Sequence, residues 1–364
     1  MSLVRKHLLS IAPYEAGKPI EEVKRQLGLK EIIKLASNEN PLGPSPKAVA
    51  AIRKSLSTIN RYPDSNGFYL KRKLAKFLGV EPANLVLGNG SDELIDILIK
   101  TFVEEDEQII TSDHTFLEYK IISSVKNRTV VTVPLKYFKY DLRAIKERID
   151  KKTKMVFISN PNNPTGTYVT KYEVEDFMRG LPEDLLVVLD EAYDTFIDVD
   201  DFPNSLALVK NKNVIALKTF SKAYGLAGLR IGYAIARPEL AGYMEIARQP
   251  FNVNSLAQVA AAAALDDKKF LARTKKTISI GKSYLYDALS NLGISYVHTV
   301  ANFIMIDVGR DGVGVFKEML KFGLIVRDMK QYGLKNFIRV TIGTKKENER
   351  FIKVLKKVLA GGSR

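Results

Sequence analysis

The sequence predicts an α/β protein in which helices cover both faces of a mostly parallel sheet. Short apolar runs alternate with amphipathic helical segments from about residue 84 onwards. Most of these runs end where polar residues gather, as the strands of open parallel sheets do. The chain has 364 residues, of which 46% are hydrophobic, so it can bury the cores of one large and one smaller domain.

Six apolar runs are the expected strands, and the segments around them suggest three parts. The expected strands are residues 84–88, 129–134, 155–159, 185–190, 213–219 and 232–236. Residues 1–40, with one short helical piece and a proline-rich exit, would form an arm. Residues 41–250 would form the large domain. An alanine-rich helical stretch, long amphipathic segments and two strand-like runs predict a smaller domain at 251–364.

Composition and charge disfavour several functional classes. The net charge of +15 suits an anionic partner, but the lysines are spread over amphipathic segments such as 69–79 and 351–362. This distribution favours solvated helix faces over nucleic-acid binding. His7, His114 and His298 lie far apart, so no metal site is expected. The chain has no cysteine, which suits the reducing cytoplasm, and no apolar run approaches the ~18 residues of a membrane span.

The first expected strand is followed by a glycine-rich turn and a helical pattern, LGNGSDELIDILIKTF. Ser91 or Asp92 can cap the helix, and Gly88 and Gly90 let the backbone approach a ligand closely. The free N–H groups of a helix start favour phosphate. Because Glu93 replaces the third glycine of the dinucleotide fingerprint, a phosphate cradle and an ordinary capped loop both remain open.

Polar side chains follow three later strands. Asn163 lies in the rigid loop SNPNNPTG, Asp190 ends the run LLVVLD, and Lys222 follows NVIALKT. Because parallel strands end at a common rim, we expect these side chains to converge there, although Asp190 would serve equally well as a helix cap. Lys222, eight residues before Arg230, would act as an amine nucleophile towards a carbonyl. A lysine, a carboxylate and a phosphate cradle together indicate pyridoxal phosphate.

Nine motifs carry a family resemblance. In chain order they are PYEAGKPIEEVKRQLGL, KLASNENPLGPSP, RYPD, GNGSDE, SNPNNPTG, DEAY, TFSKAYGLAGLR, VRDM and IRVTIGT. With these motifs, over nearly its full length, the chain resembles the fold-type I pyridoxal-phosphate aminotransferases, and within them the histidinol-phosphate aminotransferases.

The resemblance implies roles at the cofactor. Lys222 would bind pyridoxal phosphate covalently and carry the proton between substrate and cofactor, and Asp190 would pair with the pyridinium nitrogen. The other implied cofactor contacts are Gly90, Ser91, Asp92, Thr219 and Arg230 at the phosphate, Asn163 and Tyr193 at the phenolic oxygen, and Tyr119 stacked on the ring. Tyr193 is also implied as catalytic. His114 stands where relatives commonly have a proline, which leaves the path of the loop before Tyr119 open.

The resemblance also implies a substrate site and an assembly. Arg339 would bind the amino-acid carboxylate, and Arg327 with Tyr14 would contact the phosphate and imidazole end of the substrate. Asn40 is a further implied substrate-binding residue. Tyr62 would reach the cofactor phosphate of a neighbouring subunit, so a homodimer is implied.

The implied reaction is the transamination of L-histidinol phosphate with 2-oxoglutarate, which gives imidazole-acetol phosphate and glutamate in histidine biosynthesis. Aromatic amino acid aminotransferases and threonine-phosphate decarboxylases of the same fold remain alternatives. A cofactor-sensing transcription regulator is disfavoured, because the arm is too short for a DNA-binding domain. A nicotinamide-dependent oxidoreductase is disfavoured by the incomplete glycine fingerprint.

Overall fold

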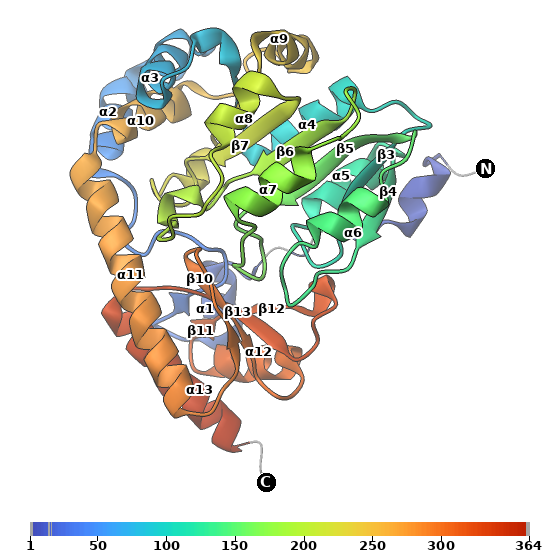
Figure 1. The fold of residues 1–364 in the computed structure, drawn as a ribbon. Helices are drawn as coiled ribbons and strands as arrows, with labels where there is room; N and C mark the ends of the chain where they lie inside the picture. Colours follow the sequence, from blue (N-terminus) through green and yellow to red (C-terminus); the bar gives the residue numbers. More distant parts are fainter. Residues whose placement is uncertain (1–2, 14, 16, 362–364) are drawn as a thin grey trace.

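The structure is a computed structural model that describes residues 3–13, 15 and 17–361. The chain folds into a large lobe, at the top of Figure 1, and a smaller lobe below it, and a long helix runs from one to the other. This arrangement confirms the predicted α/β class with two lobes.

A seven-stranded sheet forms the centre of the large lobe, in the order β2-β8-β7-β6-β5-β3-β4. Only β8 runs antiparallel to its neighbours. The strands are β2 (Leu85–Gly88), β3 (Gln108–Ser112), β4 (Thr129–Val133), β5 (Thr153–Ser159), β6 (Leu186–Asp190), β7 (Val214–Thr219) and β8 (Gly232–Ile235). The six predicted strands are confirmed, and β3 is an additional one.

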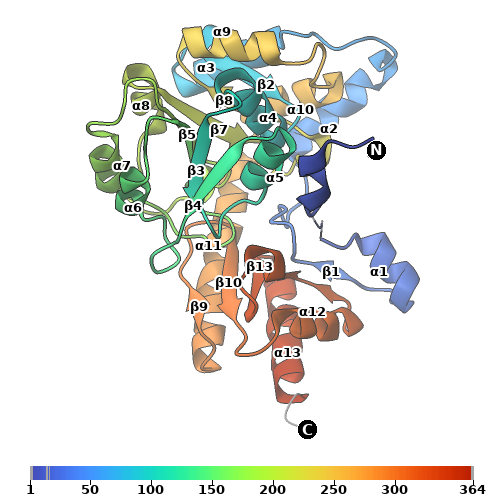
Figure 2. The same ribbon diagram turned by 90° about the vertical axis from the view of Figure 1, so that its right-hand side faces the viewer.

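Helices cover both faces of this sheet, as Figure 2 shows edge-on. One face packs against α4 (Ser91–Phe102), α5 (Glu118–Val125) and α9 (Pro238–Ala247). The other face packs against α6 (Leu142–Glu147), α7 (Lys171–Met178) and α8 (Ser205–Asn211). Side chains alternate between the faces, so that Val188 enters the first core and Val187 the second.

Three further helices form a layer at the edge of the large lobe, at the upper left of Figure 1. They are α2 (Pro46–Ser55), α3 (Phe68–Leu78) and α10 (Ser255–Leu265). The alanines of α10, including Ala257 and Ala261, are buried in the core of the large lobe. This packing differs from the predicted start of the small domain at residue 251, and we propose a boundary near Asp266 instead.

The long helix α11 (Lys268–Asn291) leads into the small lobe, which lies at the bottom of both views in Figure 1 and Figure 2. Its four-stranded antiparallel sheet has the order β12-β13-β10-β9. These strands are β9 (Tyr296–Val297), β10 (Phe303–Asp307), β12 (Arg327–Asp328) and β13 (Phe337–Thr341), and they pack with α11, α12 (Gly312–Lys321) and α13 (Lys345–Gly361).

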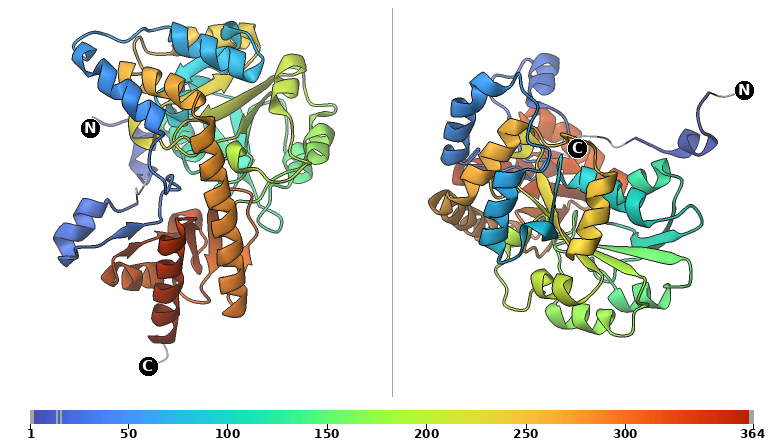
Figure 3. Two further views of the ribbon diagram at one scale, coloured as in Figure 1. Left: turned by 90° about the vertical axis from the view of Figure 1, so that its left-hand side faces the viewer. Right: turned by 90° about the horizontal axis from the view of Figure 1, so that it is seen from above.

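The predicted arm contacts both lobes, as the left view of Figure 3 shows. It contains a 3₁₀ turn, η1 (Lys6–Ser10), a helix, α1 (Ile20–Leu27), and a short strand, β1 (Ile33–Lys34). His7 Nε2 lies 3.1 Å from the carbonyl oxygen of Val125 at the end of α5. Strand β1 pairs in parallel with β11 (Leu324–Ile325) of the small lobe.

Over the residues described, no helix is long and apolar enough to cross a membrane. The same residues contain no cluster of histidine, aspartate and glutamate side chains arranged to hold a metal ion.

Candidate active site

A cavity of about 330 Å³ lies between the lobes, beyond the carboxyl ends of β5, β6 and β7. Strand β7 and the two strands before it end there because the sheet is parallel in this region. The cavity brings together ten of the predicted site residues, namely Ser91, Asp92, Asn163, Asp190, Tyr193, Thr219, Lys222, Arg230, Arg327 and Arg339. The predicted convergence of polar residues at one rim is therefore confirmed.

Asp190, the last residue of β6, is a buried carboxylate. Its Oδ2 accepts a hydrogen bond of 2.6 Å from the Tyr119 hydroxyl, and its Oδ1 accepts one of 3.2 Å from the backbone N–H of Ala192. Burial raises the pKa of Asp190 to about 6. No cationic side chain of the described residues pairs with it, so it suits a ligand that brings a positive charge.

Lys222 lies three residues beyond β7 and is half-buried. Its Nζ donates a hydrogen bond of 3.1 Å to the carbonyl oxygen of Ser37 and lies 5.8 Å from the centre of the Tyr193 ring. The Tyr193 hydroxyl accepts a hydrogen bond of 2.9 Å from Asn38 Nδ2, and burial raises the pKa of this tyrosine. The amine and the phenol therefore face the same cavity from different loops.

The start of α4 forms a close-fitting cradle with Arg230. A Cβ atom at Gly90 would lie 2.4 Å from Arg230 Nη2, and one at Gly232 would lie 2.9 Å from the backbone nitrogen of Ser91. Arg230 itself has a φ of 53° and donates a hydrogen bond of 2.9 Å to Asp92 Oδ2. Without side chains, these glycines let the Arg230 guanidinium and the neighbouring backbone pack directly against the start of α4. A helix N-terminus beside a guanidinium is an arrangement that favours phosphate.

Two arginines of the small lobe form the opposite wall. Arg327 on β12 and Arg339 on β13 are directly opposite each other in the strand register, and both are buried. Like charges in this position repel, so an anionic ligand would relieve an unfavourable contact. Arg339 donates to Asn163 Oδ1 and, at 3.0 Å, to the carbonyl oxygen of Ala36, while its buried Nε has no partner. None of the described carboxylates pairs with Arg339.

A buried ionic network lies directly behind the cavity. Lys218 Nζ contacts Glu191 Oε2 at 2.6 Å and also contacts Asp194. Burial lowers the pKa of Lys218, but the two carboxylates outweigh burial and raise it well above its ordinary value. These three residues are the chain neighbours of Thr219, Asp190 and Tyr193, so the network holds the strand ends that carry the site. Nothing in the sequence separated them from ordinary surface charges.

The structure places Tyr119 differently from the expectation that it stacks on the cofactor ring. Its ring is fully buried and stacks on Phe157 at 4.7 Å between ring centres. The aromatic residue of this segment that lines the cavity is Phe116, which contacts Tyr119 edge-to-face at 5.6 Å. We correct the expectation on this ground: α5 begins at Glu118 and turns Tyr119 towards the sheet.

The side chain of His114, in the loop before Tyr119, contacts the small lobe. Its Nδ1 lies 2.5 Å from the carbonyl oxygen of Tyr332 in the small lobe. The next residue, Thr115, donates a hydrogen bond of 2.8 Å to Asn162 Oδ1. The loop that presents Phe116 is therefore fixed on both sides.

Asn40 also lies apart from the cavity lining. Its Nδ2 donates to the carbonyl oxygen of Ala223 at 2.9 Å and to Thr274 Oγ1 at 3.1 Å. The side-chain amide of Asn40 therefore links the loop that carries Lys222 to α11, and it is already hydrogen-bonded within the protein. Asn38, which sequence reasoning missed, lines the cavity instead.

Tyr62, Gly90 and Tyr14 complete the set of predicted site residues. Tyr62 is 83% exposed and stacks on Phe251 at 4.7 Å, away from the cavity of its own chain. Gly90 contributes through the space it leaves for Arg230. Tyr14 lies outside the described residues.

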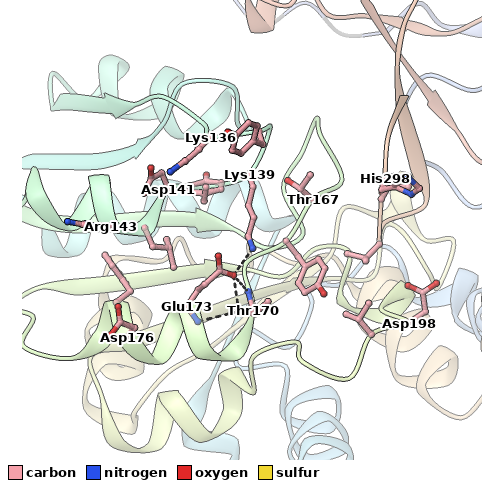
Figure 4. A pocket seen from close by; sticks show the side chains of 18 of the residues that line it. Lys136, Lys139, Asp141, Arg143, Thr167, Thr170, Glu173, Asp176, Asp198 and His298 are labelled. Carbon is pink, nitrogen blue, oxygen red and sulfur yellow. Dashed lines mark hydrogen bonds and ion pairs between the residues drawn. The ribbon is translucent and has the colours of Figure 1, made fainter. Parts of the chain in front are cut away.

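A second and larger cavity, of about 1030 Å³, opens elsewhere between the lobes (Figure 4). Its one buried charged side chain among the described residues, Lys282, is paired, and its other charged side chains are at least partly exposed to water. Lys139 contacts Glu173 at 2.6 Å, and Lys282 of α11 contacts Asp198 at 2.6 Å. It contains none of the residues that the sequence singled out for chemistry.

Comparisons with known proteins agree with this geometry. The family model for aminotransferase class I and II matches residues 30–355. The histidinol-phosphate aminotransferase of Moorella thermoacetica is 49% identical over 358 residues, which cover 98% of this chain and 93% of the relative. Histidinol-phosphate aminotransferase 2 of Carboxydothermus hydrogenoformans is 46% identical over 98% of this chain and 99% of its own.

A solved structure is similar over the whole chain. The histidinol-phosphate aminotransferase from Sinorhizobium meliloti, in complex with pyridoxal-5'-phosphate, matches with a TM-score of 0.92 and 28% sequence identity. The match covers 100% of this chain and 99% of that one.

Proposed function

The chain belongs to the aminotransferase class I and II family, and we propose that it transaminates L-histidinol phosphate with 2-oxoglutarate in histidine biosynthesis. One observation carries the choice of substrate: Arg327 and Arg339 face each other at the cavity, with no described carboxylate paired to Arg339. Glutamate and histidinol phosphate are both anions of the kind that paired arginines bind.

The residues of the cavity fit pyridoxal phosphate as the cofactor. Lys222 would hold it covalently, Asp190 would lie at its ring nitrogen, and Phe116 would flank its ring. Its phosphate would bind at the start of α4, where Ser91, Asp92, Arg230 and Thr219 line the cavity. When bound, pyridoxal phosphate withdraws electrons from the substrate Cα and so makes loss of the Cα proton easier.

The chain's own residues then perform the remaining tasks. Lys222 Nζ removes the proton from the substrate Cα as a general base and later returns a proton as an acid. Asp190 supplies a fixed negative charge, which the hydrogen bond from Tyr119 holds in place. Tyr193, oriented by Asn38, and Asn163, oriented by Arg339, donate to or accept from polar atoms of the bound cofactor.

Each of the two arginines binds a different anionic group of the substrates. Arg339 binds the carboxylate of glutamate, and Arg327 binds the phosphate of histidinol phosphate, since a planar guanidinium offers two parallel donors to either group. Tyr14 would join Arg327 at the phosphate and imidazole end.

Substrate assays test this proposal. Purified enzyme loaded with pyridoxal phosphate should form glutamate from 2-oxoglutarate fastest with histidinol phosphate as amino donor. Faster turnover of phenylalanine would move the enzyme to the aromatic aminotransferases. Release of carbon dioxide from threonine phosphate without 2-oxoglutarate would make it a decarboxylase.

We further propose a homodimer that works in the cytoplasm. Exposed apolar side chains gather on the segments around α3 and α9, namely Leu56, Ile59, Tyr62, Phe68, Tyr69, Tyr243, Ile246 and Phe251. A second copy of the chain would cover them, and Tyr62 would reach the partner's cofactor phosphate. Light scattering should give twice the chain mass of 40.8 kDa.

The proposed location in the cytoplasm rests on the composition of the chain. The absence of cysteine supports a reducing compartment.

A further inference from the structure

One glutamine connects the arm to an arginine of the proposed substrate site. Gln331 lies on η6 (Lys330–Tyr332), just after the strand that carries Arg327. Its Oε1 accepts hydrogen bonds of 3.2 Å from Arg327 Nη2 and 3.2 Å from the backbone N–H of Glu15. Its Nε2 donates one of 3.3 Å to the carbonyl oxygen of Pro13.

These contacts join segments that are far apart in the sequence. Gln331 is 316 residues from Glu15 and 318 residues from Pro13. Gly17, two residues after Glu15 in the arm, lines the proposed active-site cavity. The described residues of the arm therefore lie along the edge of the cavity that Arg327 forms, and Gln331 bonds to two of them.

The element that carries Gln331 is itself held in place. The carbonyl oxygen of Tyr332, the next residue, lies 2.5 Å from His114 Nδ1 of the large lobe. Gln331 is half-buried, and both atoms of its amide are engaged. Its position therefore depends on contacts with both lobes and with the arm.

The neutrality of this side chain matters for an anion site. A carboxylate at this position would pair with Arg327 and reduce its attraction for an anionic substrate. The amide oxygen orients the guanidinium without placing a negative charge beside it. A neutral acceptor beside Arg327 thus preserves the electrostatic character of the cavity.

We propose that Gln331 is a positioning residue that couples the arm to Arg327, so that one amide holds both the arm backbone and the guanidinium that binds the substrate phosphate. This inference rests on the proposed function for the identity of the anion. The arm contact is independent of it, and the two can be tested apart.

The arm contact is tested by hydrogen exchange without any substrate. In the cofactor-loaded Gln331→Ala variant, the Glu15 amide should exchange about tenfold faster than in the wild type, because its acceptor is gone. Lys330→Ala, a change at the exposed neighbouring residue, is the matched control and should leave this amide unchanged. Equal exchange in wild type and Gln331→Ala would overturn the proposed coupling.

Steady-state kinetics test the effect on Arg327. Gln331→Ala should raise KM for histidinol phosphate about tenfold and change kcat less than about twofold, because a charged hydrogen bond is lost. Gln331→Glu should raise this KM about 30-fold or more, because the new carboxylate competes for the guanidinium. KM for phenylalanine should change less than about threefold in both variants.

The outcomes separate the inference from the proposed function. A Gln331→Glu enzyme with wild-type KM for histidinol phosphate would overturn the role of Gln331, as would equal losses for both donors, which indicate a general structural defect. A wild-type enzyme that ignores histidinol phosphate would instead contradict the proposed function, and the exchange at Glu15 would still decide whether Gln331 holds the arm.

Discussion

The two cavities between the lobes differ in volume and in how their buried charges are paired. The cavity of about 1030 Å³ has lysines that contact carboxylates, as in the pairs Lys139–Glu173 and Lys282–Asp198. In the cavity of about 330 Å³, Asp190 has no cationic partner and Arg339 has no carboxylate partner among the described residues. The smaller cavity thus holds charges of both signs that the described part of the chain leaves unpaired.

This difference identifies the functional cavity better than volume does. Buried charges without partners cost stability, so a fold retains them where a ligand completes the pairs. In the larger cavity the buried lysine Lys282 is paired with Asp198, and the other charged side chains lie at least partly in water, where a missing partner costs little. Charge pairing therefore favours the smaller cavity as the active site.

The largest expected effect is that of removing Lys222. Lys222→Ala should lower kcat for histidinol phosphate by about 10⁴-fold, because the variant lacks both the covalent attachment and the general base. Circular dichroism should show an unchanged fold, since the side chain is only half-buried. Turnover within tenfold of the wild type would contradict the mechanism.

The next largest effect concerns Arg327. Arg327→Ala should raise KM for histidinol phosphate by about 100-fold, because a buried charged partner of the phosphate is lost. KM for phenylalanine, which has no phosphate, should rise by less than about fivefold. Equal increases for the two donors would remove the phosphate role from this residue.

Replacing Asp190 by asparagine should stabilise the cofactor-free protein but weaken its binding of pyridoxal phosphate. Its pKa is raised from 3.8 to about 6, so in the cofactor-free protein its contribution to stability is lost as pH rises through this window. Cofactor-free Asp190→Asn should therefore be more stable than the wild type above pH 6, by up to about 3 kcal/mol. It should bind pyridoxal phosphate more weakly.

Thermal unfolding at pH 5 and pH 7.5 checks the sign of this effect. The advantage of cofactor-free Asp190→Asn over the wild type should be larger at the higher pH. Addition of pyridoxal phosphate at pH 7.5 should stabilise the wild type more than the variant. A variant that is less stable than the wild type at both pH values, without cofactor, would show that the carboxylate is not strained by burial.

The smallest effect is expected in the larger cavity. Lys139→Ala removes the pair with Glu173, in which both side chains are partly exposed. Such pairs contribute about 0–1 kcal/mol to stability, and kcat/KM should change by less than about twofold. A tenfold loss of activity would show that the larger cavity takes part in catalysis, which would contradict the functional difference between the two cavities.

The sequence predicted the rim of the sheet well, because the position of a residue after a parallel strand determines where it lies. Asn163, Asp190 and Lys222 converge for this reason. Strand β3 was missed because Gln108, Thr111 and Ser112 interrupt its apolar pattern. The structure buries Thr111, whose hydroxyl donates to a backbone carbonyl of β5 at 3.1 Å.

Residues whose orientation depends on tertiary contacts could not be predicted. Phe116 and Tyr119 are three positions apart, and the start of α5 together with the contacts of His114 and Thr115 decides which ring faces the cavity. Asn38 and Asn40 present the same difficulty. Gln331 gave no signal, because its partners on the arm are more than 300 residues away.

The visible absorbance spectrum of the purified protein, supplied with pyridoxal phosphate, tests the central claim most directly. The band of lysine-bound cofactor should appear in the wild type and be absent in Lys222→Ala. It should be lost when histidinol phosphate is added without a keto acid, and return when 2-oxoglutarate follows. No band in the wild type, or the same band in Lys222→Ala, would contradict the assignment of the smaller cavity as the active site.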